Sequence, residues 1–152
     1  MTSSAWIDAA LTAGRLEITA TPDLHHFTAI LDALERETAP VVGDGRPQPL
    51  AVLLRDDAGS VAGGLWGCTI HAWLTITLMF VPPPLRGHGV GTALVRLAEA
   101  TARARGCIGV QVDAYEFQAA GFYQRLGFEA FGVQENNPPG HRRIFFARSL
   151  TE

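Results

Sequence analysis

The apolar positions of the chain change their spacing several times, and each change predicts a different element. Between residues 22 and 38, apolar side chains recur every three or four positions, which predicts an amphipathic helix. Two short apolar runs, 50–55 and 61–70, flank a turn that ends at Gly59, an arrangement typical of a β-hairpin. A third run, 73–81, leads directly into three prolines, which cannot donate hydrogen bonds to a neighbouring strand and so end the element.

The second half of the chain alternates between helical and extended patterns. Its predicted elements are a helix from residue 91 to Gly106, a strand at 107–113, a short helix at 117–126, and strands near 128–134 and 143–150. A further strand is expected before the helix at 22–38. The order is then strand, helix, antiparallel strands, helix, strand, helix and two final strands.

This order predicts an α/β (α+β) fold around one central sheet of six to seven strands, mixed but mostly antiparallel and flanked by helices. The strand–helix–strand segment 73–113 is expected to form a right-handed parallel crossover. With 152 residues, 47% of them hydrophobic and 18% charged, the composition is typical of one globular domain over residues 1–152.

The charges narrow the range of functions. A net charge of −3 disfavours a nucleic-acid binder that acts through a general basic surface. All twelve basic residues are Arg, which excludes P-loop NTPases and enzymes that form a Schiff base on lysine. Residues 1–76 contain nine acids and four Arg, whereas residues 77–152 contain six acids and eight Arg. An anionic ligand is therefore expected on the C-terminal half.

Other features point to a cytoplasmic protein without a metal. Cys68 and Cys107 stand alone in apolar surroundings, which fits a reducing compartment. The N-terminus lacks the pattern of a signal peptide, and the most apolar stretch, 73–81, is too short to span a bilayer. No group of His, Cys, Asp or Glu has the spacing of metal ligands.

A glycine-rich segment, Arg86–Gly91, lies between a predicted strand and a predicted helix. Glycines there allow backbone N–H groups to surround phosphate oxygens, and the helix adds the positive end of its dipole. The alternative is a tight turn that merely requires glycine. A dinucleotide site is a third interpretation, because Asp113 lies where a ribose-binding acid would fall. However, the glycine spacing is GxGxG rather than GxGxxG, and few βα units follow.

Two motifs together resemble the GNAT N-acetyltransferase superfamily. Arg86-Gly87-His88-Gly89-Val90-Gly91 looks like the Arg/Gln-x-x-Gly-x-Gly signature of that family, and it lies between the expected strand and helix. Downstream, Ala119, Tyr123 and Gly127-Phe128 resemble its Ala-x-x-x-Tyr-x-x-x-Gly-Phe element. The order of elements agrees from about residue 15 to the end. The resemblance implies the family's fold, with a splayed pair of parallel strands.

The resemblance also implies a set of contacts to acetyl-CoA. Backbone amides of the glycine-rich loop would hold its pyrophosphate, and the end of the preceding strand would pair with the pantetheine arm. Many relatives bond the pantetheine through an Asn at the position of Glu116, and Gln118 is a substitute nearby. The implied cofactor contacts are Met79, Phe80, Val81, Arg86, Gly87, His88, Gly89, Val90, Gly91, Thr92 and Gln118.

For the chemistry, the resemblance implies that Tyr123 protonates the departing CoA thiolate. The base that deprotonates the acceptor is less evident, because 73–81 lacks the Glu that several relatives place on this strand. Glu116 and His141 are the candidate bases. His71, Asp113 and a chain of water molecules are alternatives.

The resulting expectation is an acetyl-CoA-dependent N-acetyltransferase that acts directly on a primary amine of a small molecule or a peptide. Two other classes stay open: a non-catalytic acyl-CoA-binding module or sensor on the same fold, and a small dinucleotide-binding protein. The sequence identifies neither the amine nor the length of the acyl group. A homodimer is compatible with the resemblance, although nothing in the sequence indicates an interface.

Overall fold

The computed structural model describes residues 2–151, without the side chains of Ser3 and Ala120. Contacts within the chain form two units, Met1–Val41 and Val42–Glu152, which are described separately below. The expectation of a single domain therefore stays a prediction. In the described part of the chain, no helix is long and apolar enough to cross a membrane.

The N-terminal unit is helical. α1 spans Ser3–Thr12 and was not predicted, whereas α2, Leu24–Val42, confirms the helix expected over residues 22–38. Asp23 begins α2, because its Oδ1 accepts a hydrogen bond from the backbone N–H of His26 at 3.2 Å. The strand expected before this helix is absent, since residues 2–23 contain no strand.

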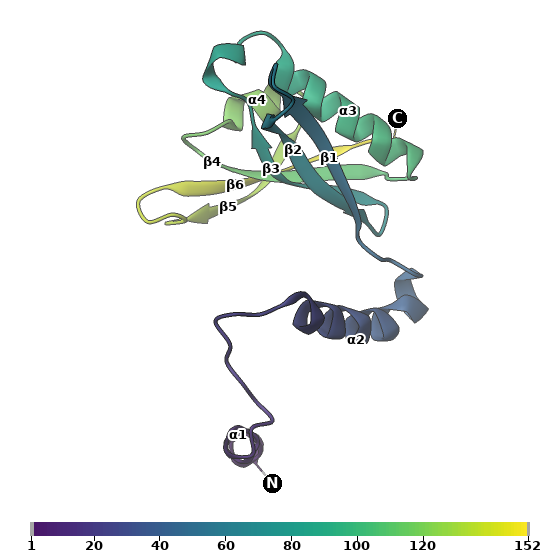
Figure 1. The fold of residues 1–152 in the computed structure, drawn as a ribbon, viewed down its shortest axis with the longest axis vertical. Helices are drawn as coiled ribbons and strands as arrows, with labels where there is room; N and C mark the ends of the chain where they lie inside the picture. Colours follow the sequence, from purple (N-terminus) through teal and green to yellow (C-terminus); the bar gives the residue numbers. More distant parts are fainter. Residues whose placement is uncertain (1, 152) are drawn as a thin grey trace. The chain divides into compact units, whose positions relative to one another are not determined.

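The C-terminal unit contains one six-stranded sheet with the order β1-β2-β3-β4-β6-β5, in which only β3 and β4 are parallel. The elements are β1 (Gln48–Arg55), β2 (Val61–Ile70), β3 (Trp73–Phe80), the 3₁₀ turn η1 (Pro83–Leu85), α3 (Val90–Ala104), β4 (Gly109–Tyr115), α4 (Ala120–Arg125), β5 (Glu129–Glu135) and β6 (Arg142–Ser149). This architecture confirms the predicted fold class, with six strands and a parallel β3–α3–β4 crossover (Figure 1).

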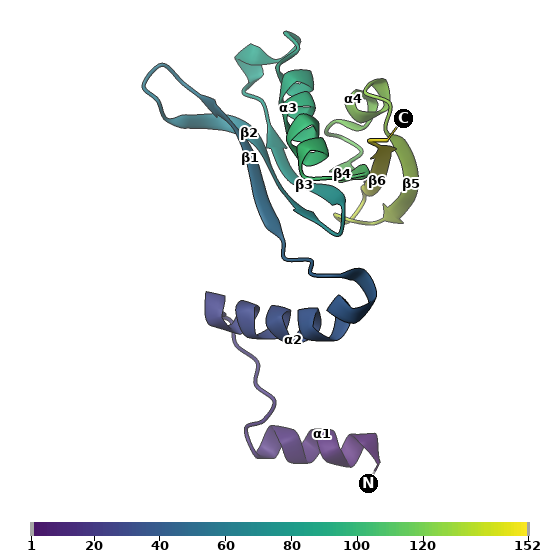
Figure 2. The ribbon, with the colours of Figure 1, turned by 90° about the vertical axis from the view of Figure 1, so that its right-hand side faces the viewer.

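The core lies between α3 and the sheet. Figure 2 shows α3 running along one face of β1, β2 and β3. The apolar face of α3 is buried there, because Leu94, Val95, Ala98 and Ala102 recur at helical spacing. From the sheet, Leu74 and Ile76 of β3 and Val110 and Val112 of β4 complete the same cluster, along with Phe146 of β6.

A bulge near the end of β3 changes the course of this strand. Trp66 pairs with Leu78 and Gly67 pairs with Ile76, so Thr77 is an extra residue without a partner on β2. A bulge bends its strand and increases the local twist. On the other side, the pairing of β3 with β4 ends at Ile76 and Val112, although β3 continues to Phe80. The two parallel strands therefore part beyond this point.

A buried ion pair joins α3 to the C-terminal strands. Glu99 is 2% exposed, and its Oε2 accepts a hydrogen bond from Nη2 of Arg148 on β6. Arg148 also donates to the carbonyl oxygen of Leu126, directly after α4. Burial raises the pKa of Glu99, and the positive charge of Arg148 offsets part of that effect. One buried pair thus fixes α3, β6 and the end of α4 to one another.

The bulge generates a prediction about Gly67, whose position leaves no room for a side chain. A Cβ at residue 67 would lie 2.3 Å from the carbonyl oxygen of Thr75. Gly67→Ala must therefore push β2 and β3 apart, and we expect the free energy of unfolding to fall by about 2 kcal/mol. Urea denaturation measures this change.

The matched control is Gly132→Ala on β5, where a Cβ would meet only the side chain of Phe145, at 3.8 Å. We expect this variant to keep nearly all of its stability, because such a distance is an ordinary van der Waals contact. Equal losses in both variants would contradict the argument from the bulge.

Candidate functional site

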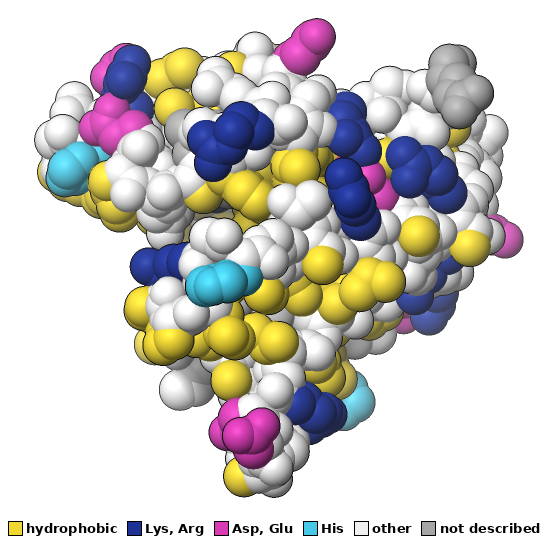
Figure 3. All heavy atoms as spheres, turned by 90° about the horizontal axis from the view of Figure 1, so that it is seen from above, with side chains coloured by type: hydrophobic (Ala, Val, Ile, Leu, Met, Phe, Trp, Pro, Cys, Tyr) yellow, Lys and Arg dark blue, Asp and Glu magenta, His cyan; other side chains and the backbone are white. Residues whose placement is uncertain are grey.

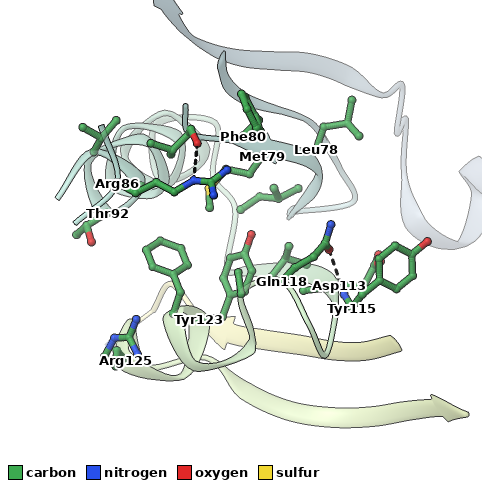
Figure 4. A pocket seen from close by; sticks show the side chains of 18 of the residues that line it. Leu78, Met79, Phe80, Arg86, Thr92, Asp113, Tyr115, Gln118, Tyr123 and Arg125 are labelled. Carbon is green, nitrogen blue, oxygen red and sulfur yellow. Dashed lines mark hydrogen bonds between the residues drawn. The ribbon is translucent and has the colours of Figure 1, made fainter. Parts of the chain in front are cut away.

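The parting of β3 and β4 opens a cavity of about 840 Å³. Its walls come from the second half of β3, the loop that leads into α3, the end of β4, the segment 117–125, and Arg143 of β6. Figure 4 shows side chains from these elements directed into one space. The cavity therefore lies where the predicted phosphate loop and the predicted Tyr123 helix meet.

The loop at one end of the cavity provides backbone amides. Gly87 and Gly89 have φ angles of 77° and 79°, in the left-handed region that favours glycine. Gly89 precedes α3, and the first N–H groups of a helix have no carbonyl one turn earlier to bond. With the positive end of the helix dipole, this end of the cavity suits an anion.

Gly91 lies in the first turn of α3, where this helix comes close to α4. A Cβ at this position would lie 3.2 Å from two ring atoms of Phe122. The glycine therefore allows the first turn of α3 to approach the helix that carries Tyr123.

Arginine side chains surround the same end. Nε of Arg86 donates to the carbonyl oxygen of Val81 at 2.9 Å, and its guanidinium lies 5.7 Å from the ring centre of Phe80. Arg125 of α4 also lines the cavity. Figure 3, which views the molecule from the side of α3 and α4, shows arginine side chains among hydrophobic ones. The surroundings of the loop are therefore positively charged, as the charge distribution predicted.

Tyr123 lies at the base of the cavity and is 3% exposed. Its ring packs against Phe122, Phe128 and Phe146, with centroid distances of 5.1, 5.5 and 5.8 Å. Figure 4 shows its hydroxyl directed into the cavity, toward β3. Burial, aided by the negative charge of Asp113, raises the pKa of Tyr123 to about 12. The phenol is therefore protonated at neutral pH.

Asp113 and Arg143 form an ion pair in the cavity wall. Nε of Arg143 donates to Oδ2 of Asp113 at 2.6 Å, and each side chain is 33% exposed. The guanidinium of Arg143 also lies 5.3 Å from the ring centre of Phe145 on the same strand. The pair is thus held in place while part of it remains accessible from the cavity.

The two candidate bases lie beside each other but outside the cavity lining. Glu116 accepts a hydrogen bond from Nε of Arg142 at 2.8 Å, and its Oε1 is 3.4 Å from Nδ1 of His141. The hydrogen bond from Arg142 lowers the pKa of Glu116. Gln118 does line the cavity, and its Oε1 accepts a hydrogen bond from the N–H of Tyr115 at 3.2 Å.

Most of the residues expected to contact a cofactor line the cavity. They are Met79, Phe80, Val81, Arg86, Gly87, Gly89, Val90, Gly91, Thr92 and Gln118. His88 is not among the lining residues, and its Nδ1 lies 2.9 Å from the carbonyl oxygen of Arg86. Two further lining residues, Arg125 and Arg143, were not predicted, because Arg125 occupies an unspecified position between Tyr123 and Gly127 and Arg143 lies outside both motifs. Among the described residues, no group of three His, Cys, Asp or Glu side chains could hold a metal ion.

The sequence matches the acetyltransferase (GNAT) family over residues 15–128. The chain is 38% identical over 104 residues to acetyltransferase Atu2258 of Agrobacterium fabrum, a match that covers 68% of this chain and 76% of that protein. It is 45% identical over 85 residues to blasticidin-S acetyltransferase of Streptomyces morookaense, covering 55% of this chain and 62% of the relative.

The fold has a close solved counterpart. The crystal structure of a proposed acetyltransferase from Agrobacterium tumefaciens superimposes with a TM-score of 0.79 at 31% identity, covering 88% of this chain and 98% of the other. The sequence match over residues 15–128 includes the cavity-forming elements β3, α3 and β4. The chain belongs to the GNAT acetyltransferase family, and the predicted resemblance is confirmed.

Proposed function

We propose that this protein transfers the acetyl group of acetyl-CoA directly to a primary amine of a small molecule or a peptide. The observation that carries the proposal is the position of Tyr123. Its protonated hydroxyl is directed into a cavity that has an anion-suited loop at one end and the free edge of β3 along one wall. Family membership supports acetyl transfer as the reaction.

The cavity suits the chemistry of CoA at both ends. The pyrophosphate would bind the backbone amides of the loop 86–92, with Arg86 and Arg125 nearby. The pantetheine arm contains two amide groups, and beyond Ile76 the edge of β3 no longer pairs with β4. Main-chain groups of Met79–Val81 would therefore pair with the arm as another strand would. The thioester would then lie near Tyr123.

The reaction is an attack of the neutral amine on the thioester carbonyl. A new C–N bond forms, and the carbonyl oxygen becomes an oxyanion that a backbone N–H at the end of β3 would stabilise. The C–S bond then breaks, and its electron pair goes to sulfur. Tyr123 donates its proton to this sulfur, and the proton that the former amine nitrogen loses restores the phenol.

The raised pKa of Tyr123 has two consequences for this step. It keeps the hydroxyl protonated throughout the neutral range, so the donor is always present. It also makes the phenol a weaker acid than the thiol it serves, because thiols have a pKa near 8.5. Transfer to sulfur therefore requires that the acidic nitrogen of the intermediate resupplies the proton at nearly the same time.

For the acceptor, we favour a small molecule over a peptide. One relative is named for acetylation of blasticidin S, a small molecule. Glu116 and His141 remain candidate bases, and from their place outside the cavity lining they would act through water. A cytoplasmic location and a homodimer also remain predictions. The main alternative is a non-catalytic acyl-CoA-binding module.

The first prediction concerns binding of the cofactor. We expect Arg86→Ala to weaken acetyl-CoA binding about tenfold, because it removes a charged hydrogen-bond donor from the phosphate end. Isothermal titration calorimetry measures this change. Arg96→Ala, an exposed arginine of α3 outside the cavity lining, is the control and should bind as the wild type does. Absence of acetyl-CoA binding in the wild type would refute the proposed cofactor.

The second prediction separates the enzyme from the binding module. We expect Tyr123→Phe to lower kcat roughly 100-fold, because the leaving sulfur loses its proton donor. Binding of acetyl-CoA should be unchanged, since the ring and its packing are retained. The assay follows CoA thiol release with blasticidin S and a panel of primary alkylamines. Unchanged turnover in the variant would remove Tyr123 from the chemistry.

The third prediction uses the pKa of Tyr123 as a reporter of its burial. The folded-state pKa of Tyr123 is about 12, above an unfolded value near 10. This difference contributes to the free energy of unfolding, and the contribution is fully present below pH 10 and is lost as the pH rises toward 12. The wild type should therefore lose roughly 2–3 kcal/mol more than Tyr123→Phe over this range. Urea denaturation from pH 9 to about pH 12 tests it. Parallel curves would mean that the phenol is solvated.

A further inference from the structure

The cavity contains a single acidic group. Of the described residues that line it, Asp113 alone carries a carboxylate, whereas Arg86, Arg125 and Arg143 carry positive charges. An acceptor that enters as an ammonium ion therefore meets one opposite charge in the lining. This observation bears on the proton acceptor, which the proposed function leaves open.

The position of Asp113 follows from the parting of the strands. Val112 is the last residue of β4 that pairs with β3, so Asp113 is the first residue beyond the pairing. Val112 is buried in the core, and the side chain of Asp113 is on the opposite face because successive residues of a strand alternate. Asp113 is 33% exposed, which leaves the carboxylate accessible to a ligand.

The neighbouring strand holds this carboxylate in place. Asp113 pairs with Phe145 of β6, and Arg143, two residues earlier on β6, reaches Oδ2 of Asp113 diagonally at 2.6 Å. Arg143 is itself held over the ring of Phe145. The contact to Tyr123 is electrostatic, since the charge of Asp113 contributes to the raised pKa of that phenol. Asp113, Arg143 and Tyr123 therefore border one space from β4, β6 and α4.

We propose that Asp113 binds the ammonium group of the acceptor and accepts its proton, and that Arg143 is the positioning residue that orients the carboxylate. The inference rests on the proposed acetyl transfer and names its substrate class, a primary amine that is protonated at neutral pH. One N–H proton passes from the ammonium to Asp113, which leaves a neutral nitrogen with a lone pair. That nitrogen attacks the thioester carbonyl, and Asp113 later releases its proton to water.

The test compares two amines of similar shape. Ethylamine is cationic at neutral pH, whereas 2,2,2-trifluoroethylamine is already neutral and needs no proton acceptor before it attacks. In Asp113→Asn, we expect kcat/KM for ethylamine to fall roughly 100-fold, and kcat/KM for trifluoroethylamine to fall by less than about tenfold. Blasticidin S, assayed in parallel, should follow ethylamine. Acetyl-CoA affinity should stay within about twofold, which confirms that the variant folds and binds the cofactor.

The positioning role of Arg143 is tested separately, by comparing KM and kcat for ethylamine in Arg143 variants. We expect Arg143→Met to raise KM for ethylamine more than it lowers kcat, because the carboxylate loses its orientation but keeps its charge. Arg143→Lys should recover most of this loss, since a cation is restored. Glu129→Gln on β5, an exposed acid outside the cavity lining, is the control and should match the wild type.

Each failure has a distinct meaning. A wild type that acetylates none of the three amines overturns the proposed function, and this inference with it. An active wild type with an equally active Asp113→Asn overturns the inference alone. Equal losses on ethylamine and trifluoroethylamine also overturn it, because they assign Asp113 a structural role. If Glu116→Gln or His141→Asn shows the selective loss instead, the proton acceptor lies outside the cavity lining.

Discussion

The end of the β3–β4 pairing at Ile76 and Val112 is the constraint on which the site depends. Two parallel strands that stayed paired would leave no room between them for a ligand. The extra residue Thr77 bends β3 away, and the last hydrogen-bonding groups of both strands become available at the walls of the cavity. The loop 86–92 comes after the part of β3 that has left β4, and Asp113 lies on the part of β4 that no longer pairs with β3. The opening between two strands therefore positions both the proposed cofactor end and the proposed acceptor end.

The other walls of the site are held by contacts that lie away from the opening. The ring of Tyr123 is enclosed by Phe122, Phe128 and Phe146, which leaves the hydroxyl as its accessible end. Arg148 bonds the carbonyl of Leu126, directly after α4, and pairs with Glu99 in the core of the unit. Burying the charge of Glu99 is costly unless an opposite charge accompanies it, and Arg148 supplies that charge. The helix that carries the phenol is thereby tied to α3, whose first turn borders the loop.

Sequence motifs predicted the glycine loop and Tyr123, whereas the other features of the site depend on how strands pair in three dimensions. The glycine loop and Tyr123 could be predicted because their roles depend on short, local patterns around residues 86–91 and 119–128. The absent first strand could not be excluded, since strand formation in residues 15–21 depends on a partner far along the chain. Asp113 and Glu116 are only three residues apart, and sequence alone does not show which one faces the cavity. In the structure Asp113 is the one that lines the cavity, where it pairs with Arg143. This ion pair depends on the register between β4 and β6.

The bulge at Thr77 also makes this site unusually sensitive to the number of residues in β3. Leu74 and Ile76 are buried, then Thr77 and Leu78 are both exposed, and Met79 packs against the core again. The bulge thus shifts the alternation of the strand by one residue. Deletion of Thr77 would restore a regular ladder with Met79 still facing the core, and it would remove the bend that carries β3 away from β4. Because main-chain groups form this wall, replacement of the exposed side chain of Leu78 would leave it intact, whereas an insertion or a deletion would alter it. The number of residues in β3 therefore matters more to this wall than the identity of its exposed side chains.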